Sequence, residues 1–131
     1  MMEPAKDCLD LGIIVGDFKA SISFYENILG LKFVEEIPAT MGTMHRLRYG
    51  KSDFKLIKPY TVPPKGPVGT DSQLGFRYVT FVVKNLSNLC TELQNKGVEF
   101  FRPEKEVRPG VRMAMVKDPD GNIVELVEKK V

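Results

Sequence analysis

The stretch "LDLGIIVGDFKASISFYENILGLKFVEE" (residues 9–36) decides the fold, because it reads as a strand, a helix and a second strand in close succession. The strand before the helix has one apolar face, formed by alternate residues: Leu11, Ile13 and Val15. Asp17 stands where a helix N-cap is expected, and Gly30 stands where the helix should end. Apolar residues recur between them at helical spacing: Phe18, Ile22, Tyr25 and Leu29.

A second stretch, "FRYVTFVVKNLSNLCTELQNKGVEFFRPE" (residues 76–104), repeats this order of elements. Asn85 takes the place of Asp17, and Gly97 takes the place of Gly30. Two further strand-like runs complete each half: "TMHRLRYG" (43–50) and "DFKLIK" (53–58), then "VRMAMVK" (111–117) and "NIVELVE" (122–128). The last of these follows "DPDGN" (118–122), a typical tight turn. Each half is therefore predicted to be a strand, a helix and three strands.

The fold class that follows is α+β, with two βαβββ modules forming a curved, cup-like mixed sheet. We expect a single domain over residues 1–131, with module 1 at about 9–60 and module 2 at about 74–130. The linker (61–73) lies in "KPYTVPPKGPVGTDSQ", whose four prolines and two glycines exclude a helix or a central strand.

Composition and charge exclude several classes of partner. The net charge of +2 is small and the basic residues do not cluster, which argues against nucleic-acid binding. The apolar runs are far shorter than the ~20 residues that cross a membrane. The start of the chain carries no signal-peptide pattern, so we expect a cytoplasmic location. Cys90 falls on an apolar helix face and is expected to be a core thiol, so a disulfide with Cys8 is not expected.

The segments "GDFKASISFYENILGLKF" (16–33) and "DPDGNIVEL" (118–126), within a duplicated chain, resemble the vicinal oxygen chelate superfamily. That superfamily includes glyoxalase I, bleomycin-resistance proteins and extradiol dioxygenases. The resemblance covers roughly residues 9–130 and implies the glyoxalase/bleomycin-resistance fold. It is specific for the fold and not for the function, because one fold hosts many activities.

In metal-dependent members of this superfamily, the first and last strands of each module supply the ligands, which are usually His, Glu or Gln. By this resemblance, the matching positions of this chain are Asp10, Lys55, Tyr78 and Glu125. Strand alternation independently turns Lys55 and Glu125 away from the helices. Only Glu125 matches the usual ligand types.

A metal site of the usual composition is therefore not expected. The single histidine, His45, lies outside the four positions and is predicted to be structural or at the surface. The Lys55 ammonium group repels a divalent cation and has no lone pair to offer. In the alternative, Asp10 and Glu125 would still bind a divalent metal ion.

Lys55 could instead supply the positive charge of the missing metal, held between Asp10 and Glu125, with Tyr78 donating a hydrogen bond. Burying such charges is tolerable only when they are paired. One interpretation is a structural ion-pair network in a cup that binds a ligand. The other is catalysis, with Glu125 as general base and Lys55 as electrophile or acid next to a carbonyl.

Further side chains are expected to line the cup. Arg46 and Arg48 would suit an anionic ligand such as a carboxylate or a phosphate. Met113 and Met115 would form an apolar wall on the side of Glu125. The segment "RPEKEVRPGVR" (102–112) is predicted to be a charged, solvated loop.

The predicted function is that of a small-molecule-binding protein of the glyoxalase/bleomycin-resistance type, metal-free and homodimeric. It would bind or transform a small anionic or polar metabolite or antibiotic. The alternative is a divalent-metal-dependent lyase, isomerase or dioxygenase of the same superfamily.

Overall fold

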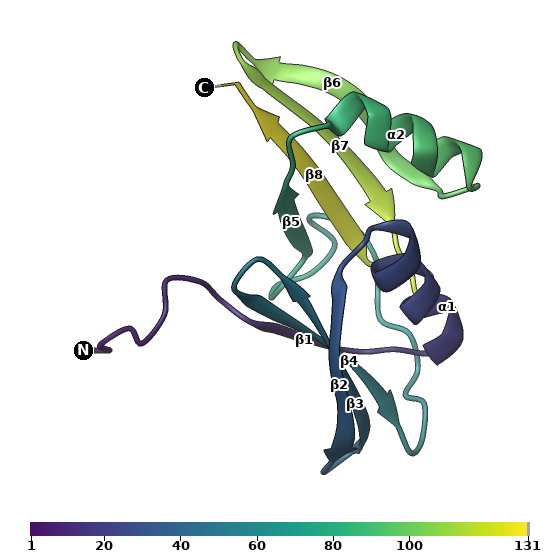
Figure 1. The fold of residues 1–131 in the computed structure, drawn as a ribbon. Helices are drawn as coiled ribbons and strands as arrows, with labels where there is room; N and C mark the ends of the chain where they lie inside the picture. The colour runs from purple at the N-terminus through teal and green to yellow at the C-terminus, as the bar shows by residue number, and fades with distance from the viewer. Residues whose placement is uncertain (131) are drawn as a thin grey trace. The chain divides into compact units, whose positions relative to one another are not determined.

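The computed structural model describes residues 1–130 and divides into two units, Met1–Pro64 and Lys65–Val131. Each unit contains one four-stranded sheet and one helical segment (Figure 1). The order of elements is strand, helix and three strands in both units, so the predicted pair of βαβββ modules is confirmed.

The first unit contains a sheet with the strand order β1-β4-β3-β2. Its elements are β1 (Leu11–Ile14), α1 (Phe18–Ile22), the π-helix η1 (Ser23–Ile28), β2 (Lys32–Ala39), β3 (Gly42–Tyr49) and β4 (Ser52–Pro59). The pair β1–β4 is parallel, whereas β4–β3 and β3–β2 are antiparallel. The sheet is therefore mixed, with β1 and β2 at its edges and β4 and β3 between them.

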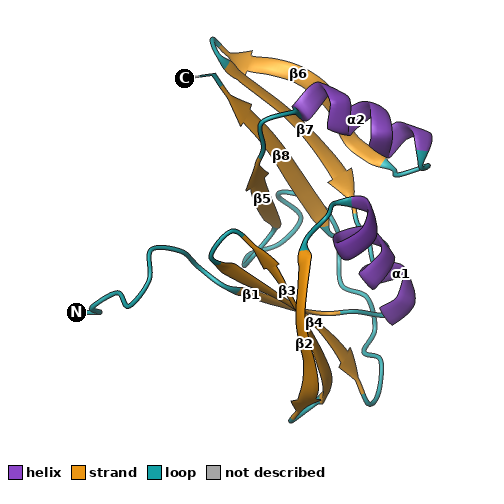
Figure 2. Ribbon diagram, viewed as in Figure 1, coloured by secondary structure: helices purple, strands orange, loops and turns teal. Residues whose placement is uncertain are grey.

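The second unit repeats this topology with the strand order β5-β8-β7-β6 (Figure 2). Its elements are β5 (Tyr78–Val82), α2 (Leu86–Asn95), β6 (Phe100–Arg108), β7 (Val111–Lys117) and β8 (Ile123–Lys129). The pair β5–β8 is parallel and the other pairs are antiparallel. Residues 60–77, between β4 and β5, form no helix or strand.

Each helical segment packs its apolar side chains against one face of the sheet of its own unit. In the first unit the buried core contains Val15, Phe24, Tyr25, Leu31, Leu47, Phe54 and Leu56. In the second unit it contains Phe81, Leu86, Cys90, Leu93, Ala114, Val116, Val124 and Leu126. The alternation predicted for 54–56 and 124–126 is confirmed, because the flanking apolar residues are buried in both strands.

The two helices begin in different ways. Asp17 caps α1 as predicted, because its Oδ1 accepts a hydrogen bond from the Ala20 N–H at 3.0 Å. Asn85 makes no side-chain cap. Instead, Glu128 of β8 accepts a hydrogen bond from the Leu86 N–H at 2.8 Å. A carboxylate from the last strand therefore caps α2.

Two further predictions can be compared with the structure. The loop predicted for 102–112 is wrong, because this segment forms most of β6 and the start of β7. Pro103 is tolerated there because β6 is an edge strand whose pairing with β7 is interrupted by register shifts. Cys90 is buried and both cysteines are free, as expected. Among residues 1–130, no helix is long and apolar enough to cross a membrane.

Candidate functional site

Lys55 lies within β4, on the face of the first sheet that points away from α1. Its strand neighbours Phe54 and Leu56 are buried in the core on the opposite face. In the sheet register, Lys55 stands beside Gly12 of β1 and Arg46 of β3. The predicted orientation of Lys55 is therefore confirmed.

Arg46 and Arg48 lie on the same face of β3, as the alternation predicted, and each already contacts a carboxylate. Arg46 Nη1 is 3.1 Å from Glu35 Oε1, and its Nε is 4.0 Å from Asp53 Oδ2. Arg48 donates two hydrogen bonds to Asp53 Oδ1, from Nε at 3.1 Å and from Nη2 at 3.0 Å. These carboxylates neutralise much of the positive charge that the two arginines would offer to a ligand.

Asp10 lies just before β1 and has a different partner from the one predicted. Its Oδ1 accepts hydrogen bonds from Lys6 Nζ and from the Asp53 N–H, both at 2.7 Å. These hydrogen bonds, that from Lys6 above all, lower the pKa of Asp10, and the nearby charge of Lys55 contributes less. The predicted clamp of Asp10 on Lys55 is thus not formed, because Lys6 is four residues away along the chain and reaches Asp10 directly.

Lys55 is distinguished from these neighbouring cations by having no acidic partner. Within the first unit, residues 1–64, no carboxylate oxygen lies within 4.0 Å of Lys55 Nζ, whereas Lys6, Arg46 and Arg48 all have one. The side chain is half-buried. Lys55 is therefore a cation on this face whose charge is available to a bound anion. Its pairing with Glu125 stays a prediction.

In the second unit, Glu125 lies on the face of the sheet that points away from α2. Its neighbours Val124 and Leu126 are buried on the helix side. Thr80 of β5 stands beside Glu125 in the register and donates a hydrogen bond from Oγ1 to Glu125 Oε1 at 2.7 Å. Tyr78, the predicted donor, lies on the same face but is 53% exposed.

Thr80 is the residue of this site that the sequence analysis missed. The signal was present in the alternation, because Thr80 is two residues after Tyr78 and therefore points to the same face. The parallel pairing that sets Thr80 beside Glu125 follows from the fold and not from local sequence.

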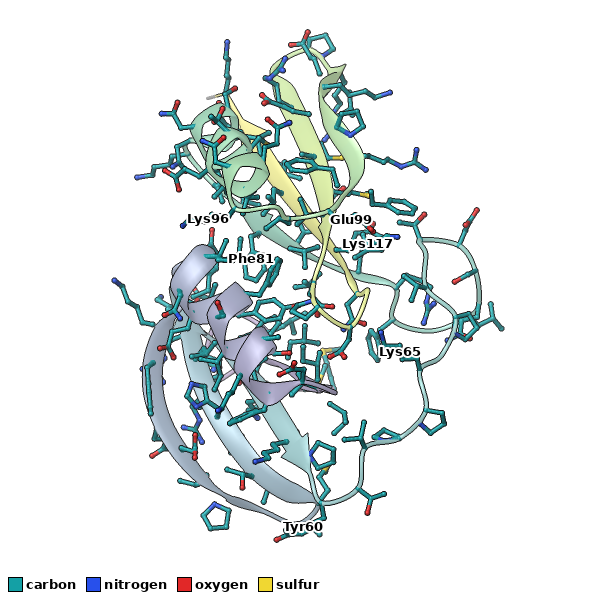
Figure 3. The ribbon with its side chains drawn as sticks, turned by 90° about the vertical axis from the view of Figure 1, so that its right-hand side faces the viewer. Tyr60, Lys65, Phe81, Lys96, Glu99 and Lys117 are labelled. Carbon is teal, nitrogen blue, oxygen red and sulfur yellow. The ribbon has the colours of Figure 1, made fainter. Side chains whose placement is uncertain are left out.

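Met113 and Met115 share the face of Glu125, as predicted. Met115 stands opposite Glu125 in the register and is buried, and Met113 stands opposite Val127. Lys117, at the end of the same strand, lies with its Nζ 2.7 Å from Glu99 Oε2, and both residues are labelled in Figure 3. The cation at this end of β7 is thus paired with an acid.

His45 is a structural residue on the helix-facing side of β3. It is buried, with Nδ1 2.9 Å from Glu36 and Nε2 3.0 Å from Glu26 of the π-helix. The rings of Phe18 and Phe33 pack against its imidazole. The side chain therefore ties η1 to the sheet, away from the face that carries Lys55.

Comparison with known proteins gives this duplicated fold a family. The sequence model of the "Glyoxalase/Bleomycin resistance protein/Dioxygenase superfamily" matches residues 9–126. The chain belongs to this superfamily. The resemblance noted from the sequence is therefore confirmed.

The proteins that this chain resembles carry names that indicate different functions. A lactoylglutathione lyase of Salmonella typhimurium is 29% identical over 119 residues, which cover 88% of this chain and 87% of the relative. The structure of a trypanothione-dependent glyoxalase I from Leishmania major has a TM-score of 0.74 at 27% identity, covering 95% of this chain and 87% of that one. TnmS3, an antibiotic-binding protein from a Streptomyces species, shares the fold with a TM-score of 0.74 at 22% identity, over 98% of this chain and 100% of that one.

The residues at the four positions that the sequence resemblance assigns to metal ligands do not fit a divalent metal ion, because an ammonium group and a phenol replace the usual donors. In the first unit, Asp10 is bonded to Lys6, and Lys55 offers an ammonium group. In the second unit, Tyr78 offers a phenol, and Glu125 offers a carboxylate that already accepts a hydrogen bond from Thr80.

Proposed function

We propose that this protein binds a small anionic molecule without a metal ion and that Lys55 supplies the positive charge. The observation that supports the proposal is that Lys55 has no acidic partner within the first unit, at a position that the sequence resemblance assigns to a ligand. The ammonium group of a half-buried lysine attracts an anion more strongly than it would in bulk water, because the effective dielectric constant near the protein is lower.

Binding is better supported than acid–base catalysis. The catalytic interpretation needs Glu125 as a general base close to the substrate. In the described structure one oxygen of Glu125 already accepts a short hydrogen bond from Thr80. That bond fixes the orientation of the carboxylate, which serves ligand positioning as well as it serves proton abstraction.

We also propose that the protein acts as a cytoplasmic homodimer. The support is the apolar character of the segment that leads into β5, an edge strand of its sheet. Leu74 and Phe76 are 99% and 96% exposed, and Tyr78 follows them on the strand. Exposed apolar side chains gathered on one segment are typical of an interaction surface. Light scattering after size-exclusion chromatography tests the dimer, and a monomer at micromolar concentration would contradict it.

A second candidate function is a divalent-metal-dependent lyase. Its support is the 29% identity with lactoylglutathione lyase over most of both chains, together with Glu125 at a ligand position. The ammonium group of Lys55 argues against it, because a charged lysine has no lone pair to donate at a position where a metal ligand is expected.

The experiment that tests the proposal is anion binding in the presence of a chelator. Isothermal titration with small carboxylates in EDTA is compared for the native protein, Lys55→Met and Lys58→Met. Lys58 is the matched control, because it lies on the same strand and is exposed on the opposite face. We expect binding to the native protein and to Lys58→Met, with loss in Lys55→Met. Equal binding by all three proteins would refute the role of Lys55.

A further inference from the structure

Beside Lys55, the same face of the first sheet carries a continuous row of apolar side chains. The row crosses all four strands in register and consists of Ile14, Ile57, Met44 and Ile37. Ile14 is exposed, and the other three are half-buried. One ligand could therefore contact both the apolar row, through a hydrocarbon part, and the Lys55 ammonium group, through a negative charge.

The row of residues next to it is polar and contains a gap at Gly12. Gly12 stands beside Lys55, and its strand position is exposed. A Cβ placed on Gly12 would meet only Ile57 Cδ1 at 3.9 Å and Lys55 Cβ at 4.0 Å, which are ordinary contacts. Its φ is not in the left-handed region, so the backbone does not require glycine. The missing side chain leaves space on one side of the Lys55 stem.

The charges on this face limit the ligand to a single negative charge near Lys55. Arg46 and Arg48 are each neutralised by their own carboxylate partners, Glu35 and Asp53. Lys32 also lies on this face, but at the far edge of the sheet, opposite Arg48. A dianion such as a phosphate monoester, seated against Lys55, would place its second charge beside the acids Glu35 and Asp53, so a monoanion fits this position better.

We infer that the ligand is an amphipathic carboxylate whose head lies over Gly12 against Lys55 and whose hydrocarbon part covers the apolar row. The row lies two residues further along the strands, about 7 Å from the Lys55 row. A carboxylate with a body of several carbons spans that distance. This inference rests on the proposed anion binding and adds the class of ligand and its orientation.

The test is a series of unbranched carboxylates of increasing length, from acetate to octanoate, titrated into the native protein in the presence of EDTA. Once the chain reaches the apolar row, each added methylene is expected to tighten binding roughly fourfold, the factor that corresponds to ~0.8 kcal/mol per buried CH₂. Octanol and octanamide, which lack the charge, are expected to bind at least tenfold more weakly than octanoate.

Two variants locate the two parts of the ligand. Gly12→Val fills the space beside Lys55 and is expected to weaken every carboxylate at least tenfold, and Gly12→Ala verifies that the strand accepts a side chain there. Ile14→Ser is expected to weaken octanoate severalfold and to leave acetate unchanged.

The possible failures are distinguishable. Acetate and octanoate of equal affinity, both lost in Lys55→Met, would overturn the amphipathic class while leaving anion binding intact. Binding of octanoate that survives both Gly12→Val and Lys55→Met would overturn the assigned orientation. Binding of no carboxylate would overturn this inference and the proposed function together.

Discussion

The start of α2 gives a prediction about which residue stabilises the helix: Glu128, which is distant in sequence, or the adjacent Asn85. Glu128 of β8 accepts the hydrogen bond from the Leu86 N–H at 2.8 Å, whereas Asn85 makes no side-chain cap. Glu128→Ala removes a cap, which costs about 1 kcal/mol. It also removes a carboxylate from the positive end of the helix dipole, which costs about 0.5 kcal/mol more. We therefore expect a loss of about 1.5 kcal/mol in the free energy of unfolding.

This loss converts into a melting temperature that can be measured. An unfolding entropy of about 2.1 cal/mol/K per residue gives about 0.28 kcal/mol/K for cooperative unfolding of a 131-residue chain. Glu128→Ala should then melt about 5 °C below the native protein by circular dichroism. Asn85→Ala is the matched control and should melt within about 1 °C of it. Equal losses in both variants, or a larger loss in Asn85→Ala, would refute the capping role of Glu128.

Two further predictions concern titratable groups. The pKa of Asp10 is lowered by its hydrogen bonds, so its stabilising contribution is present above the unfolded-state value of 3.8 and is lost as pH falls through the lowered pKa. The native protein should therefore exceed Asp10→Asn in urea midpoint at pH 6, and this difference should shrink below about pH 4; a difference that is constant with pH would contradict the assignment. Burial raises the pKa of Cys90 to about 11, so Ellman's reagent at pH 8 should modify Cys90 only after unfolding, and rapid modification of Cys90 in the folded protein would contradict its core position.

The parts of the fold that could be predicted from the sequence depend on local patterns. Alternation turned Lys55 and Glu125 away from the helices, because each is flanked by apolar residues that the core requires. The "DPDGN" turn was predictable because its Asp, Pro, Gly and Asn residues favour a tight turn locally. In the structure, Asp118 accepts hydrogen bonds there from the Asp120 and Asn122 N–H groups.

The parts that could not be predicted depend on neighbours that the fold brings together. The partners of Arg46 and Glu125 come from adjacent strands whose register is a tertiary property. The widening of the first helix to a π-helix over Ser23–Ile28 has no local sequence signal, although Glu26 there reaches His45 of β3. The strand at 102–112 was mistaken for a loop because proline and charge are tolerated on an edge strand.

The most direct test of a lysine acting in place of a metal is the metal content of the protein. The chain is produced in medium supplemented with zinc, nickel, manganese and iron, purified without chelator, and analysed by inductively coupled plasma mass spectrometry beside Glu125→Gln. We predict that no metal is present at one equivalent per chain and that the two proteins give the same result. One equivalent of a single divalent metal, lost in Glu125→Gln, would contradict the proposal and favour the metal-dependent lyase.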